Sequence, residues 1–161
     1  EDRNLLEAQL EKIFEYIGEN QEITFQSIEE LATKLKVYTI FNLFDAIDKK
    51  DNANAINIAY NLLESSDLGI IGIIAMLNKH FSALLRINEL ERSNLSEAEK
   101  AKATGTHPIF YKNLVNAANL YGQKNIFKAV EAIYNADVQV KSTSLDEKTI
   151  LTILIADILA D

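Results

Sequence analysis

Apolar residues recur at helical spacing along most of this chain. In the first segment one helical face carries Leu5, Leu6, Leu10, Ile13, Phe14 and Ile17. Such spacing places apolar side chains on one face of an amphipathic helix. No stretch alternates apolar and polar residues between hairpin turns, as half-buried strands do. The pattern therefore predicts an all-α fold built as a helical bundle.

Residues that begin and end helices divide this pattern into segments. We expect helices to start near Asn4, Thr24, Thr39, Asp51 or Asn52, Asp67, Ser96, Pro108, Asn125 and Ser144. Ser96 with Glu99, and Ser144 with Glu147, have the spacing of a capping box. Glycines are expected to end three of the helices, at Gly18, Gly105 and Gly122.

Two segments are more apolar than one packing partner requires. The first is the run from residue 68 to residue 77, which is about half as long as the roughly 20 residues of a membrane span. We interpret it as buried protein that is covered on several sides. The second is the last helix, which carries Ile150, Leu151, Leu154, Ile155, Ile158 and Leu159. Both segments are either central helices covered within the chain or parts of an interface.

Composition narrows the class of protein. The chain has 161 residues, enough for one domain or for one domain and part of another. Five glycines and one proline favour long helices. The absence of cysteine excludes disulfides and thiolate metal sites, and it fits a cytoplasmic location. A net charge of −8 argues against a surface devoted to phosphate binding. No leader segment is visible, and we expect the chain to be a fragment of a longer protein.

The polar residues do not form a recognisable catalytic, cofactor or metal site. His80 and His107 lie far apart and lack the spacing of zinc ligands. Asp45 and Asp48 share a helical face, but no histidine or third carboxylate converges on them in the sequence. The glycines do not have the spacing of a phosphate-binding loop. The chain is therefore not expected to be an enzyme or to bind a cofactor.

Several short motifs occur in an order that resembles one known family. The first are Asn4-Leu5-Leu6 with Glu11-Lys12, Ile23-Thr24, and the run from Thr39 to Ile47. Later motifs are Leu84-Leu85-Arg86 with Glu89-Leu90, His107-Pro108 with Lys112, and Asp137 with Lys141. Each motif alone is unspecific. Together they resemble the delta-subunit family of the bacterial DNA polymerase III clamp loader, from which Ser82 and Thr143 depart locally.

The resemblance implies a domain organisation and a function. Residues 1–36 would be the truncated C-terminal part of the three-helix AAA+ lid domain, and residues 37–161 the collar domain that serves oligomerisation. The collar would join tau/gamma and delta-prime in a pentameric ring, as a non-catalytic scaffold of the machine that loads the sliding clamp in DNA replication. The parent subunit would belong to the DNA polymerase III holoenzyme, and it would touch the clamp through an N-terminal domain missing here. The alternative is a free-standing helical adaptor for protein–protein interaction, unrelated to replication.

Candidate interaction residues follow from the apolar surface of the last helix and from the resemblance to the delta-subunit family. The subunit-interface candidates are Ile150, Leu151, Leu154, Ile155, Ile158, Asp137 and Lys141. Asp137 and Lys141 are also spaced to form an ordinary ion pair within one helix. Tyr111 and Lys112 are candidates for weak contact with template DNA, since an aromatic ring and a cation together suit exposed bases and phosphates.

Two pairs of aromatic residues that are close in the sequence are expected to contribute to the core. Phe110 and Tyr111 are adjacent, so they should point about 100° apart, and one of them should be core. In the helix that Thr39 caps, Phe41 and Phe44 are expected to point inward.

Overall fold

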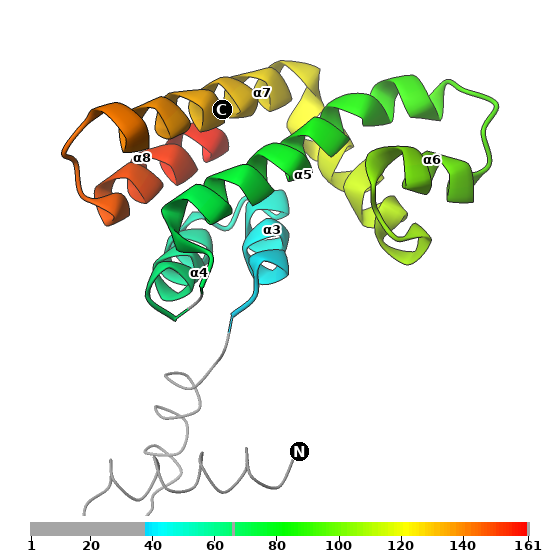
Figure 1. Ribbon diagram of the computed structural model, residues 1–161. Coiled ribbons are helices and arrows are strands. Elements are labelled where there is room, and N and C mark those ends of the chain that lie inside the picture. Colours follow the sequence, from blue (N-terminus) through cyan, green and yellow to red (C-terminus); the bar gives the residue numbers. More distant parts are fainter. Residues whose placement is uncertain (1–37, 66, 161) are drawn as a thin grey trace, which may run out of the picture. The chain divides into compact units, whose positions relative to one another are not determined.

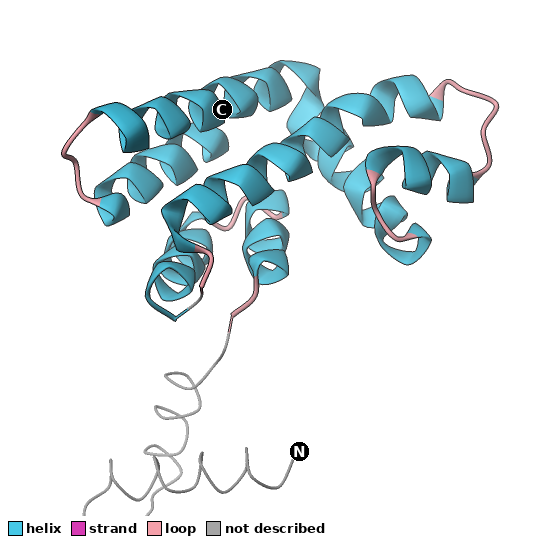
Figure 2. Ribbon diagram, in the orientation of Figure 1, coloured by secondary structure: helices cyan, strands magenta, loops and turns pink. Residues whose placement is uncertain are grey.

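The computed structural model describes residues 38–65 and 67–160, all of which belong to one unit that begins at Tyr38. Their helices are α3 (Ile40–Asp48), α4 (Asn52–Ser65), α5 (Gly69–Glu91), α6 (Glu97–Thr104), α7 (Pro108–Ser142) and α8 (Glu147–Leu159). Figures 1 and 2 show these helices joined by short loops, and the described ranges contain no strand. The predicted all-α fold is therefore confirmed. The helices expected before residue 37, and the predicted lid–collar boundary, lie outside the described residues.

The fifth helix forms the centre of the bundle. α5 contacts α3, α4, α6 and α7, and its largest contact is with α7. In Figure 1, α8 and the second half of α7 lie at one end of α5, and α6 with the start of α7 lies at the other. Within the described residues, one continuous core joins all of these helices. Burial of that apolar surface is the main force that stabilises such a bundle.

The apolar run at the start of α5 is buried on one face, so the prediction that it would be covered on several sides was wrong. Ile70, Ile73, Ile74 and Leu77 share the buried face, whereas Leu68 and Ile71 are exposed. By length and composition alone, α5 would be able to cross a membrane. Because four other helices pack around it, we interpret it as the core helix of the bundle.

Two of the predicted helix starts are confirmed in detail. Ser96 lies at the N-cap of α6, where its N–H donates to Glu99 Oε2 at 2.9 Å and its Oγ accepts from the Glu99 N–H at 3.4 Å. The hydrogen bond that the Ser96 hydroxyl donates to Glu99 Oε2 at 2.7 Å, and then the bond from the Ser96 N–H, lower the pKa of the Glu99 carboxyl. At α3, the extended backbone of Thr39 forms the N-cap and its N–H donates to Asn42 Oδ1 at 2.9 Å. Gly105 ends α6 in the left-handed region, as expected.

The prediction for the start of the last helix was wrong by two residues. The N-cap of α8 is Asp146 and not Ser144. Asp146 Oδ1 accepts a hydrogen bond from the Thr149 N–H at 3.0 Å, and the Thr149 hydroxyl donates to Oδ2. These bonds to the charged carboxylate lower its pKa. Asp146 thus accepts from a backbone donor in the first turn of α8, in place of the capping box predicted for Ser144 and Glu147.

The inward-facing residues of α3 also differ from the prediction. Ile40, Leu43, Ala46 and Ile47 are buried. Phe41 was expected to point inward, but its side chain is 70% exposed. The helical period explains the difference, because the face that contains residues 40, 43 and 47 leaves residue 41 about 100° away.

α7 is broken at Gly122, where the sequence predicts the end of one helix and the start of another. The backbone there has φ 69° and ψ 156°, which is not helical. No heavy atom lies within 4 Å of where a Cβ would be placed, so the position needs glycine for its backbone angles and not for space. The break lets the two halves of α7 pack in different directions.

Replacing Gly122 with alanine is expected to lower the free energy of unfolding by about 1–3 kcal/mol, because a side chain disfavours these backbone angles. Urea denaturation followed by circular dichroism would measure the change. Gln123→Ala, at the exposed neighbouring position, should change stability by less than about 0.5 kcal/mol. Equal stability of Gly122→Ala and the parent chain would contradict the positive φ at residue 122.

Candidate functional site

The last helix places its predicted interface residues in the core of this chain. Five side chains of α8 are almost completely buried, namely Ile150, Leu151, Leu154, Ile155 and Ile158. α8 packs against α7 and α4, and it is further linked to α4 by an ion pair between Lys148 and Glu64. The structure therefore favours the intramolecular interpretation, because the chain itself covers the apolar excess of this helix.

Asp137 and Lys141 form the predicted pair within one helix. Lys141 Nζ lies 2.6 Å from Asp137 Oδ2, and both side chains are partly exposed. A surface pair of this kind contributes little to stability. Its position is more informative, because it flanks an exposed apolar surface on the second half of α7.

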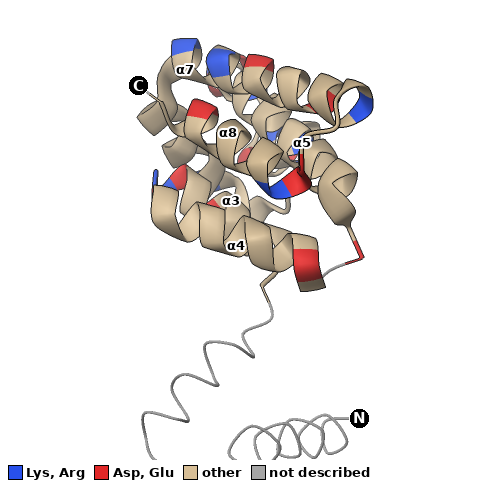
Figure 3. Cartoon of the chain, turned by 90° about the vertical axis from the view of Figure 1, so that its left-hand side faces the viewer, with Lys and Arg blue, Asp and Glu red and all other residues tan. Residues whose placement is uncertain are grey.

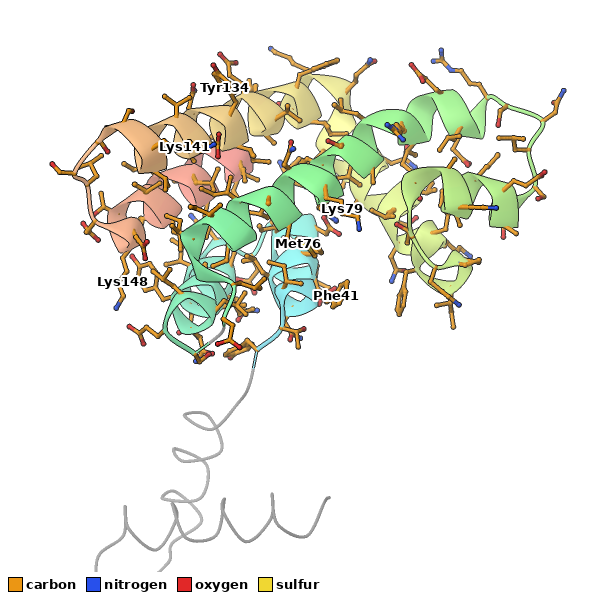
Figure 4. The ribbon with its side chains drawn as sticks, in the orientation of Figure 1. Phe41, Met76, Lys79, Tyr134, Lys141 and Lys148 are labelled. Carbon is orange, nitrogen blue, oxygen red and sulfur yellow. The ribbon has the colours of Figure 1, made fainter. Side chains whose placement is uncertain are left out.

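We call that surface the α7 stripe and define it as Phe127, Tyr134 and Val138. Their spacing of seven and four residues puts them on one side of the helix. Phe127 is 55% exposed and Tyr134 is 66% exposed. Figure 4 shows Tyr134 on the outer side of α7, and Figure 3 shows residues of both charge signs along the same helix. The exposed Glu131 lies between Phe127 and Tyr134 on this side of α7, so the stripe combines apolar side chains with charged ones.

The aromatic residues at the start of α7 are divided between core and surface. Tyr111 is buried, and its hydroxyl donates to Glu91 Oε1 at 3.0 Å. Burial, together with this carboxylate, raises the pKa of Tyr111 to about 12. Phe110 is 59% exposed, so the expectation that one of the two is core is confirmed. Tyr111 is thus a packing residue, and DNA contact at the exposed Lys112 stays a prediction.

A second exposed feature is a cavity of about 620 Å³ between α3, α5 and the start of α7, which we call the aromatic groove. Aromatic and other apolar side chains form most of its walls, including Phe41, Phe44, Met76, Phe110 and Leu114. Its polar lining residues include Asp45, Asp48, Lys79, His80, His107 and Asn113. The volume falls within the range of roughly 300–1,000 Å³ that is common for ligand sites.

One side of the groove is formed by a partly buried polar contact. His80 Nε2 lies 2.7 Å from Asp48 Oδ1, and the ring of Phe44 stacks on the His80 ring at 4.4 Å between centroids. Behind them, Phe81 packs edge-on against Tyr121, whose hydroxyl donates to the Ile47 carbonyl at 2.8 Å. Asp48 and His80 therefore satisfy each other and hold α3 against α5.

Among residues 38–65 and 67–160, no group of three or more His, Cys, Asp or Glu side chains could hold a metal ion. Asp45 pairs with Lys49 at 2.6 Å, and Asp48 pairs with His80. The two carboxylates that share a face of α3 are thus engaged in separate contacts. Asp45 is therefore a surface residue, and Asp48 is a packing residue.

Burial, and to a smaller extent the charge of Asp48, raises the pKa of Tyr121 well above its ordinary value of 10.0. The folded state therefore prefers the neutral phenol. The protonated Tyr121 phenol therefore stabilises the fold. This stabilisation is fully present below pH 10, the ordinary pKa of tyrosine, and is lost as the pH rises toward the higher pKa of the folded state. We expect the loss of stability between pH 8 and pH 11 to be smaller in Tyr121→Phe than in the parent chain. Urea denaturation at both pH values would test this, and equal losses would contradict it.

Sequence reasoning missed the α7 stripe and the aromatic groove. The signal for the stripe was present, since Phe127, Tyr134 and Val138 lie off the face that carries the buried Ile126, Ala129 and Ile133. The groove had no local signal, because its walls come from helices that are distant in the sequence.

Residues 38–158 match the family described as "DNA polymerase III delta subunit, C-terminal domain". The chain belongs to this family, which confirms the resemblance found in the sequence.

One curated relative and one solved structure, both from Bacillus subtilis, are similar to most of the chain. The chain is 21% identical over 151 residues to DNA polymerase III subunit delta of Bacillus subtilis, a match that covers 94% of this chain and 43% of the relative. The solved structure of the Bacillus subtilis DNA clamp loader delta protein has the same fold, with a TM-score of 0.64 and 20% identity. That match covers 94% of this chain and 44% of the solved chain. The chain thus spans less than half the length of the relatives it matches.

Proposed function

We propose that this chain is the C-terminal, non-catalytic part of a clamp-loader delta subunit and that it holds this subunit in the assembly. In this proposal residues 37–161 are the collar domain, and residues 1–36 are the end of the lid domain. The partners are the tau/gamma and delta-prime subunits, which would form a pentameric collar with it in the cytoplasm. Contact with the sliding clamp would belong to a preceding domain of the full-length subunit.

The observation that carries the proposed role in assembly is the α7 stripe. Large aromatic side chains are enriched at the centres of protein interfaces, where their burial provides much of the binding free energy. Phe127 and Tyr134 expose large rings two turns apart on the same side of the helix. The Asp137–Lys141 pair at its margin supplies charges that could fix the register of a partner. Family membership indicates which partners to test.

The proposal is tested by mixing this chain with tau/gamma and delta-prime from the same organism and measuring the masses of the complexes by native mass spectrometry. A heteromer that contains this chain is expected at micromolar concentrations. Masses of the separate components alone would contradict the proposal. A free-standing adaptor would also fail to join this assembly, and the gene sequence upstream of Glu1 would distinguish it by lacking a nucleotide-binding-like domain.

A further inference from the structure

The second half of α7 carries two opposite charges placed symmetrically about one aromatic ring. Phe127 lies three residues after Lys124 and four residues before Glu131. These steps put the three residues on one side of the helix, with each charge about one turn away from the ring. All three residues are exposed, and the side chain of Phe127 is 55% exposed. A cation, an aromatic ring and an anion thus follow one another along the outer side of α7.

Both charges remain available to another molecule. Among the residues that the structure describes, neither Lys124 nor Glu131 belongs to an ion pair. Farther along the same helix, Asp137 and Lys141 already pair with each other. Lys124 and Glu131 are therefore the charges beside Phe127 that can fix the register of a partner.

The order of these residues makes α7 complementary to a second copy of itself. When two such helices run antiparallel with Phe127 of each at a two-fold axis, Lys124 of one copy lies opposite Glu131 of the other. The symmetry repeats this contact, so one dimer contains two ion pairs around a central pair of rings. A parallel arrangement would place like charges opposite each other, which is unfavourable.

The local charge of α7 permits this pairing, although the whole chain has a net charge of −8. From residue 123 to residue 142 the chain carries three lysines and two carboxylates, so this half of the helix is slightly positive. Figure 3 shows residues of both charge signs along it. Exposed charges more than about 8 Å apart are largely screened at physiological ionic strength, so the charges nearest the contact dominate.

We propose that two copies of this chain pair through antiparallel α7 helices, with the Phe127 rings in contact and Lys124 of each copy paired with Glu131 of the other. Only a few turns of one helix from each copy meet, so the dissociation constant should be on the order of 100 μM. The dimer and the clamp-loader assembly then compete for the same side of α7. This competition, unlike the dimer itself, rests on the proposed function.

Sedimentation equilibrium of the 161-residue chain, from micromolar to millimolar concentration, tests the pairing. The average mass is expected to rise from that of one chain toward that of two. Phe127→Ala should weaken the dimer about tenfold, because the central apolar contact is lost. Lys124→Glu and Glu131→Lys should each weaken it about tenfold, because each reversal turns two attractive contacts into repulsive ones.

A mixture of the two charge-reversed chains provides the sharpest result. A heterodimer of Lys124→Glu with Glu131→Lys contains both ion pairs again, each with its signs in a matching order. An equimolar mixture should therefore dimerise about as strongly as the parent chain, although neither variant does so alone. Lys102→Glu, which makes the same charge change at an exposed position of α6, is the matched control and should dimerise like the parent. Circular dichroism melting confirms that each variant is folded.

Three outcomes would overturn the proposal. They are the mass of a single chain at every concentration, a dimer that Phe127→Ala leaves unchanged, and a mixture of the charge-reversed variants that associates no better than each variant alone. A chain that stays monomeric by itself and still joins tau/gamma and delta-prime would overturn the dimer and leave the proposed function standing. A dimer with the expected variant behaviour that never joins those subunits would support the pairing and contradict the proposed function.

Discussion

Replacing Phe81 with alanine is expected to lower the free energy of unfolding by about 3–5 kcal/mol. Phe81 is fully buried on α5, where its ring packs edge-on against both His80 and Tyr121. Truncation removes the apolar contacts and leaves a cavity where α3, α5 and α7 meet. Because domains of this size are stable by only about 5–15 kcal/mol, the variant should melt far below the parent chain or fail to fold.

Urea denaturation followed by circular dichroism measures the effect of Phe81→Ala. Phe41→Ala is the matched control, since it removes the same side chain from a position that is 70% exposed. Its expected change is less than about 1 kcal/mol. A similar loss of stability in the two variants would show that Phe81 does not occupy the centre of the core.

Replacing Tyr134 with aspartate is expected to weaken the proposed association with tau/gamma and delta-prime about 100-fold. The reason is that an aromatic anchor of the α7 stripe is lost and a charge is placed in an apolar contact. The side chain is 66% exposed in this chain, so stability should change little. The dissociation constant of the complex, measured by titration with a labelled chain, provides the comparison.

Leu95→Asp is the matched control for this prediction. It introduces the same charge at another exposed apolar position, between α5 and α6. Association should then be close to that of the parent chain. If Tyr134→Asp and Leu95→Asp behave alike while both remain folded, the α7 stripe is not the contact surface.

The sequence predicted most of the described fold, because helix signals are local. The Ser96 capping box, Gly105, the break at Gly122 and the proline start at residue 108 each depend on neighbours a few residues away. The start of α8 was missed because two possible caps, Ser144 and Asp146, lie two residues apart. Local spacing alone does not choose between them.

The candidate site was less predictable, because exposure depends on helices that are distant in the sequence. The apolar residues from Ile150 to Ile158 were predicted to exceed what one packing partner requires, but α4 and α7 together cover them. Phe41 was predicted to be a core residue, but Ile40, Leu43 and Ile47 occupy the buried face of α3. The exposure of the α7 stripe and the walls of the aromatic groove depend on how these helices pack around α5, which local sequence patterns do not show.

The role proposed for the α7 stripe can be tested directly inside the assembled clamp loader. In the full-length subunit, the residue that corresponds to Tyr134 would be replaced by a photo-crosslinking phenylalanine derivative, and in a second sample the residue that corresponds to Lys102, on the exposed side of α6, would be replaced instead. After irradiation, mass spectrometry identifies the crosslinked chains. The account predicts crosslinks from position 134 to tau/gamma or delta-prime and none from position 102. Crosslinks to another subunit from position 102 but not from position 134 would contradict it.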